Sequence, residues 1–220
     1  MTHFFHQEIR QPARNFSAWI NAFSLFAATC FIIGWPLRDD LVTTSLVGPS
    51  ATLALLVLSQ FLIFSPMWRQ DTEGKLVEVL CAQGNRQIER YSRGRLAAAI
   101  LVGWAYALVA TATGTVLFSI SLDGSIANML KLLLISPALS AVAILTSAAV
   151  TGSSRNSTAL GVVIMIPMIA PVVIFSGIYD AQSYVANSIW VNSLTSLLGL
   201  SIIYCTTAFF ALPTILRAQT

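Results

Sequence analysis

Residues 96–120 read LAAAILVGWAYALVATATGTVLFSI, a stretch of 25 residues without a charged side chain. A helix of roughly 20 apolar residues is long enough to cross the hydrocarbon core of a bilayer, which is about 30 Å thick. The apolar residues run continuously, whereas the strands of a membrane β-barrel alternate apolar and polar residues. The stretch therefore predicts a transmembrane α-helix, in which every backbone N–H and C=O is paired within its own segment.

Five further apolar stretches have a comparable length. They predict spans at residues 16–37, 46–68, 129–150, 158–178 and 189–212. The composition agrees, because 56% of the residues are hydrophobic and only 10% are charged, against about 25% charged in soluble domains. The sequence thus predicts an all-α membrane protein with six transmembrane helices in a single domain over residues 1–220. It excludes a cytosolic globular enzyme and a secreted disulfide scaffold.

The basic residues divide unevenly between the two sides of this predicted topology. One side holds ten of the twelve: Arg10, Arg14, Arg69, Lys75, Arg86, Arg90, Arg93, Arg95, Arg155 and Arg217. The other side holds Arg38 and Lys131. Because lysine and arginine are enriched in cytoplasmic loops, both termini and the polar segment 69–95 are predicted to face the cytoplasm. The net charge of +3 follows from this pattern, and we expect no nucleic-acid partner.

Ionisable side chains are rare within the predicted spans. No Asp, Glu, His or Arg lies in the interior of a span, and Lys131 lies near a helix end, where we expect its side chain to reach toward the interface. Proton-coupled transporters and voltage sensors depend on such residues at membrane depth, so the sequence argues against both. The neutral polar residues are interpreted as interhelical hydrogen-bonding groups in preference to substrate contacts. They are Asn21, Gln60, Thr111, Thr113, Thr115, Ser140, Thr146 and Thr206.

Catalytic and metal-binding motifs are absent from the sequence. There is no H-E-x-x-H motif and no G-x-x-x-x-G-K-[ST] loop for nucleotide phosphates. The two histidines, His3 and His6, lie near the N-terminus and are interpreted as solvated interfacial residues in preference to haem ligands. We therefore expect a non-catalytic subunit with no directly bound cofactor, so any energy for transport must come from a separate subunit.

Polar segment 69–95 contains the most specific positive feature. Leu76, Val79 and Leu80 are spaced i, i+3 and i+4, which places them on one face of a short helix. Gly74 opens this helix, and acidic residues surround it, namely Asp71, Glu73 and Glu78. One interpretation is an amphipathic connector that lies on the membrane. The other is a coupling helix, whose apolar face docks into a groove on a cytoplasmic partner with the charges at the rim.

Two other segments carry weaker signals. Phe5 and Ile9 are spaced i, i+4 ahead of Pro12, which predicts a short amphipathic helix at the membrane interface. Pro167 and Pro171 lie inside the fifth span, where each removes a backbone hydrogen bond and should kink or unwind the helix. A packing kink and a functional hinge or cavity wall are equally compatible with these two prolines.

The chain resembles the cytochrome c maturation protein B family (CcmB, haem exporter protein B) in four places. They are Glu8-Ile9-Arg10 with Arg14 and Asn21, then Trp68-Arg69-Gln70-Asp71 with Glu73-Gly74-Lys75-Leu76, then Ser136-Pro137-Ala138-Leu139, and finally the run from Pro167 to Phe175 with Asp180 beyond it. The last of these is the most specific. Together they cover nearly the whole chain.

The resemblance implies a membrane subunit with six helices in the ABC-2 exporter arrangement. It implies a separate, CcmA-like ATPase that docks on the segment after the second helix, and CcmC-like and small CcmD-like subunits in the same complex. The complex handles haem for c-type cytochromes, so haem is the ligand to be transported or released with its chaperone. The implied location is the bacterial inner membrane, or the mitochondrial inner membrane. The spans alone also fit an ABC-2 permease for a lipid- or drug-like substrate, or a non-transporting assembly scaffold.

Overall fold

The computed structural model describes residues 16–37, 40–73, 76–150, 157–183 and 190–218. Over these residues the regular structure is entirely helical. The helices are α2 (Phe16–Leu37), α3 (Leu41–Glu73), α4 (Leu76–Ala82), α5 (Asn85–Leu117), α6 (Leu122–Val150), α7 (Ser157–Ser183) and α8 (Trp190–Ala218). Six of them, all except α4, are long and apolar enough to cross a membrane. The predicted all-α membrane protein with six such helices is confirmed. The helix predicted around Phe5 and Ile9 lies outside the described residues.

The helix boundaries correct the prediction of a polar loop at residues 69–95. Helix α2 has the predicted bounds, but α3 continues to Glu73 and α5 already begins at Asn85. In α5 the side chains of Ile88, Tyr91 and Arg95 are buried, and their i, i+3, i+7 spacing places them on one helix face. Because this face packs against the rest of the bundle, α5 begins at Asn85, before the predicted apolar span at residues 96–120.

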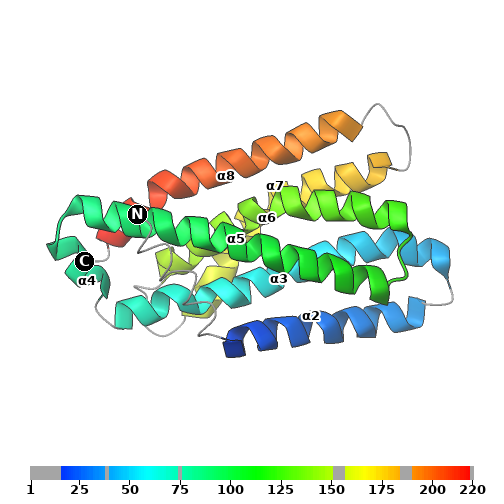
Figure 1. Cartoon of the computed structure of the whole chain (residues 1–220), viewed down its shortest axis with the longest axis horizontal. Helices are drawn as coiled ribbons and strands as arrows, with labels where there is room; N and C mark the ends of the chain where they lie inside the picture. The colour runs from blue at the N-terminus through cyan, green and yellow to red at the C-terminus, as the bar shows by residue number, and fades with distance from the viewer. Residues whose placement is uncertain (1–15, 38–39, 74–75, 151–156, 184–189, 219–220) are drawn as a thin grey trace.

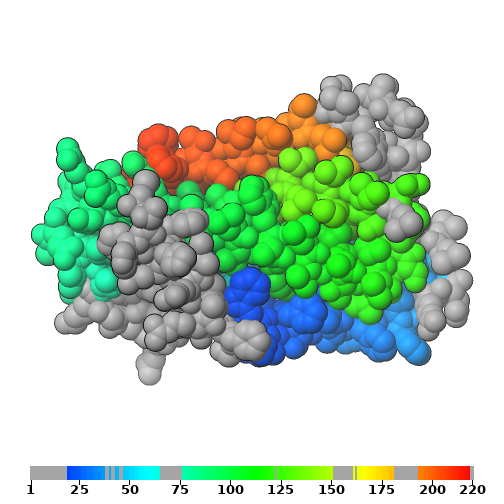
Figure 2. All heavy atoms as spheres, viewed as in Figure 1, coloured from blue at the N-terminus to red at the C-terminus, as the bar shows by residue number. Residues whose placement is uncertain are grey.

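Helix α6 forms the centre of the bundle. It contacts α3, α5, α7 and α8, and 83% of its span is buried, against 17% for α8 and 22% for α2. The long helices lie side by side, and α4 lies at one end of the bundle (Figure 1). On the face drawn in Figure 2, α8 and α2 form the two edges, and α5 and α6 lie between them. The least buried helices, α2 and α8, thus lie at the edges of the bundle. Helix α6 lies at its centre and has little contact with the surroundings of the chain.

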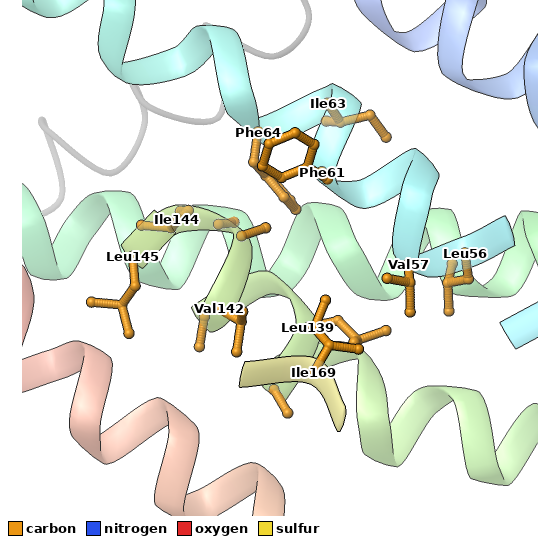
Figure 3. Packing of buried hydrophobic residues seen from close by; sticks show 14 of the residues in the cluster. Leu56, Val57, Phe61, Ile63, Phe64, Leu139, Val142, Ile144, Leu145 and Ile169 are labelled. Carbon is orange, nitrogen blue, oxygen red and sulfur yellow. The ribbon is translucent and has the colours of Figure 1, made fainter. Parts of the chain in front are cut away.

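The hydrophobic core draws on all the described helices, and a central part of it lies between α3 and α6. Leu56, Phe61 and Phe64 of α3 face Leu139 and Val142 of α6 (Figure 3). Since lipid tails are as apolar as these side chains, close van der Waals packing replaces the hydrophobic effect as the force between helices. Core contacts of this kind fix α6 against α3 and α5.

Small residues bring α5 close to its neighbours. A Cβ atom on Gly103 would lie 2.1 Å from Ser140 Oγ of α6, and one on Gly114 would lie 2.7 Å from Thr52 Oγ1 of α3. Interfaces in membranes favour such small residues because they let backbones approach. Glycine at these two positions therefore sets the separation of α5 from α6 and α3.

Candidate functional site

Helix α4 is the predicted coupling helix, and the structure corrects which of its residues face outward. Leu80 is 5% exposed and Val77 is 4% exposed, and both belong to the core of this chain. Leu76 and Val79 are 36% and 52% exposed. The prediction that Leu80 enters a partner's groove is therefore wrong for this conformation, because Leu80 anchors α4 to its own bundle. The outward apolar residues are Leu76 and Val79.

The turn after α4 fixes its orientation. Gly84 has a φ of 110° and a ψ of 160°, a combination that essentially only glycine adopts. Its N–H donates to the Cys81 carbonyl at 3.1 Å, and its own carbonyl accepts from the Gln87 N–H at 3.0 Å. The chain thereby reverses between α4 and α5, so that α4 packs back on α3 and α5.

Polar residues surround the outward face of α4. Glu78, Gln83 and Arg86 are exposed, which suits the rim of a docking surface. Two further predicted rim residues, Asp71 and Glu73, lie in the last turns of α3, but their side chains lie outside the described residues, as does Gly74. Of the predicted site residues, Leu76 and Glu78 thus lie together on the outward side, and Val79, which was not predicted as an anchor, takes the place of Leu80 there.

A second cluster ties the end of α8 to the start of α5. Arg217 Nη2 lies 2.8 Å from Glu89 Oε1, and Arg93 Nη2 lies 3.6 Å from Glu89 Oε2. The Arg93 guanidinium lies 4.4 Å from the centre of the Phe209 ring. The sequence signal for this cluster was the i, i+4 pair of Glu89 and Arg93. Its partners on α8 are distant in sequence and were not predicted.

At the opposite end of the bundle, Lys131 forms an ion pair that the sequence analysis missed. Its Nζ lies 2.7 Å from Asp180 Oδ1 and 2.8 Å from Oδ2, and the lysine side chain is fully buried. The expectation that Lys131 reaches toward the interface is therefore wrong. The reason is that α7 continues to Ser183, five residues past the predicted end of the span. Asp180 is therefore helical and lies within reach of α6.

Two buried polar side chains lie one helical turn from this ion pair. Asn128 is 3% exposed, and neither its Oδ1 nor its Nδ2 has a hydrogen-bond partner. The Oγ of Ser176 is likewise buried without a partner. Asn128 precedes Lys131 by three residues and Ser176 precedes Asp180 by four, so each shares a helix face with a member of the pair.

The neutral polar residues divide into two groups. Gln60 of α3 donates to Ser136 Oγ at 3.0 Å and accepts from Ser140 at 3.4 Å, and Thr115 bonds Ser125 of α6 at 2.9 Å. These bonds are interhelical, as predicted. Other threonines instead donate to carbonyls of their own helix, as Thr111 does to Ala107 at 2.7 Å and Thr113 to Val109 at 2.9 Å. This local bonding is an alternative open to any threonine in a helix.

The prolines singled out in the sequence lie inside unbroken helices. Pro137 lies within α6, and Pro167 and Pro171 lie within α7. The helix is therefore not unwound at these prolines. Their role as a kink or a cavity wall stays a prediction.

Metal-ligating residues do not gather in the part of the chain that the structure describes, where no group of three or more His, Cys, Asp or Glu side chains could hold a metal ion. His3 and His6 lie outside that part. The geometry thus offers a helix with an exposed apolar face at one end of a membrane bundle and a buried charge pair at the other.

Comparison with known proteins gives one family. The family model described as "CcmB protein" matches residues 1–219. No curated protein matches the chain.

Proposed function

Since the chain belongs to the CcmB family, and is thus a permease-type membrane component of the cytochrome c maturation haem-export system, we propose that a separate ATPase subunit drives it through α4. The observation that carries this proposal is the division of α4 into two faces. Val77 and Leu80 hold the helix to its own bundle, while Leu76 and Val79 point outward. A helix anchored on one side and apolar on the other can pass a partner's movement to α5.

The charge distribution supports a cytoplasmic position for α4. Arginines gather at the α4 end of α5 and α8, namely Arg86, Arg90, Arg93, Arg95 and Arg217. At the opposite end, Lys131 is the one basic residue among those that the structure describes, and it lies there with Asp40, Asp123 and Asp180. Under the positive-inside rule, the α4 end faces the cytoplasm, where ATP is available. We place the chain in the bacterial inner membrane, surrounded by lipid, in the ABC-2 exporter arrangement.

The partners follow from the family. We propose a CcmA-like ATPase on α4, together with a CcmC-like haem-handling subunit and a small CcmD-like subunit in the membrane. Haem is the ligand that this complex handles, either as cargo or as the load of a released chaperone.

The docking of the ATPase can be tested by site-specific photocrosslinking. A benzophenone amino acid at position 79 or 76 is expected to crosslink to the ATPase, because these side chains point outward. The same group at position 77 or 80 is the matched control and is expected to give crosslinks within this chain only. Crosslinked complexes would be identified by electrophoresis and mass spectrometry. Exclusive crosslinking of positions 76 and 79 to lipid would favour the interpretation of α4 as a membrane-surface connector.

The proposal also predicts that this chain supplies no axial ligand to haem from within the membrane. The described spans contain no histidine, and histidine is the commonest neutral ligand of haem iron. Replacing both His3 and His6 with alanine should leave the Soret band of haem co-purified with the complex unchanged in position and intensity. A shifted or missing band in the double variant would assign a ligand to the N-terminal segment.

A further inference from the structure

The contact between α6 and α7 at the end opposite α4 differs from the rest of the bundle in its polarity. We call Asn128, Lys131, Ser176, Tyr179 and Asp180 the α6–α7 joint. Lys131 and Asp180 form its ion pair, and the Tyr179 hydroxyl donates to the Ala127 carbonyl at 3.3 Å. Lys131 lies about 12 Å along α6 from Asp123, at a rise of about 1.5 Å per residue. Lys131 is fully buried, and a buried charge is costly unless it is paired and hydrogen-bonded.

The hydrogen bonds of the joint are incomplete in this conformation. Asn128 can donate two hydrogen bonds and accept two, and the Ser176 hydroxyl can do both. Neither side chain has a partner, although both are buried. Buried polar groups are nearly always paired, because an unpaired group loses its hydration without compensation. Water or a polar group of another molecule could supply the missing partners, because the described chain offers none.

Helix α7 is less enclosed by the rest of the chain than α6. Only 28% of its span is buried, against 83% for α6. Below the joint, Pro167 and Pro171 have no N–H, so the carbonyls of Val163 and Pro167 lose their helical donors. The segment from Val172 to Ser183 is therefore attached to the rest of α7 through a weakened stretch of helix. Among the described side chains of this segment, Asp180 contacts α6 through the ion pair and Tyr179 through its hydrogen bond.

From these observations we infer that the α6–α7 joint is a gate at the end of the bundle opposite α4. The ion pair of Lys131 with Asp180 holds it closed. When the ion pair separates, the segment of α7 from Val172 to Ser183 moves away from α6. Water then reaches Asn128, Ser176 and Lys131. The open gate presents the Lys131 ammonium and the Asn128 amide on α6 and the Asp180 carboxylate on α7, which suits a passing molecule with polar or charged groups. This inference rests on the proposed function only in that ATP hydrolysis in the partner supplies the drive.

The test measures whether a thiol in the joint becomes accessible. In a background with Cys30, Cys81 and Cys205 changed to alanine, Asn128→Cys and Ser176→Cys are each labelled with a membrane-impermeant maleimide added on the side opposite α4. Labelling of both is expected to be at least tenfold faster when the complex hydrolyses ATP than when it holds ADP. Thr52→Cys is the control, because Thr52 is fully buried toward the same end of the bundle but contacts α5. Its labelling should not respond to ATP.

A second measurement needs no ATP. Adding Asp180→Asn to Asn128→Cys removes one charge of the pair and is expected to raise the resting labelling rate at least tenfold. The charge exchange of Lys131→Asp with Asp180→Lys should restore slow labelling. An unchanged resting rate in Asp180→Asn would overturn the gate.

If the ATPase co-purifies and yet ATP does not change labelling, the gate is wrong while the proposed function stands. If no ATPase binds, the proposed function fails and the resting measurement still decides the gate.

A variant in which the joint is permanently apolar distinguishes a gate from an ion pair that only stabilises the fold. Buried ion pairs can often be replaced by apolar side chains of similar volume without loss of stability. Lys131→Met combined with Asp180→Leu should therefore preserve the level of the chain in the membrane, while labelling of Ser176→Cys stays slow under ATP and cytochrome c maturation falls at least tenfold. Normal maturation in this double variant would show that the pair only stabilises the fold, and would overturn the proposal.

Discussion

Val79→Asp is expected to remove the ATPase from the purified complex without lowering the amount of this chain in the membrane. Val79 is 52% exposed, so the folded chain accepts a charge there. A partner's apolar groove does not, because an unpaired carboxylate loses its hydration on docking. The few anchor residues of an interface each cost about 2 kcal/mol or more when they are changed, so if Val79 is such an anchor the affinity should fall at least tenfold. Co-purification of the ATPase at equal membrane levels measures the effect.

Two variants of the same helix serve as controls for Val79→Asp. Glu78 is exposed and we place it at the rim, where charges contribute little, so Glu78→Gln should retain the ATPase. Leu80→Asp buries a charge in this chain's own core and should lower the level of the chain itself, with or without a partner. Normal recovery of the ATPase with Val79→Asp would mean that α4 is not the docking site.

Gly103→Val is expected to give the largest loss of folded protein among substitutions in the spans. The first added carbon would lie 2.1 Å from Ser140 Oγ and 3.0 Å from Ser136 Oγ. Overpacking of a core costs about 1–3 kcal/mol and occasionally more. Here the hydrogen bonds of Gln60 to both serines would also be disturbed, and the valine would force α5 away from α6.

The matched control is Gly199→Val on α8. A Cβ atom there meets no atom within 4 Å, so the same change in chemistry should leave stability nearly unchanged. Fluorescence-detected size-exclusion chromatography after a heating series would give the melting temperature of each variant in detergent. Equal melting temperatures for the two valine variants would contradict the close approach of α5 to α6.

The sequence predicted the six spans because continuous apolar runs are a strong signal in a bilayer. It did not predict where α5 begins, although Ile88, Tyr91 and Arg95 already carried helical spacing. The start of α5 was not recognised because the residues between these three are polar, and their low hydropathy suggested a loop. Helix α4 shows a similar limit. Leu76, Val79 and Leu80 share one broad face, and only the position of α5 determines that Leu80 turns inward while Val79 turns outward.

The ion pair of Lys131 and Asp180 could not be predicted from local patterns. The two residues are 49 positions apart, and each lies near the end of its span, where a charge usually reaches toward water. Pairing them requires the relative height of α6 and α7, which depends on packing over the whole bundle. The burial of the Asn128 amide without a hydrogen-bond partner could not be predicted for the same reason. An asparagine in the first turns of a helix is common and gives no signal in the sequence.

The unbroken length of α5 has a mechanical consequence. At about 1.5 Å per residue, its 33 residues form a rod about 50 Å long. One end carries Ile88 and Tyr91 beside α4, and the other carries Gly114 against Thr52. A tilt of about 5° around the middle of a rod this long displaces each end by about 2 Å in opposite directions. Helix α5 is thus long enough to cross the whole membrane. If it tilts as one rigid body, distance labels at its two ends should move in opposite directions.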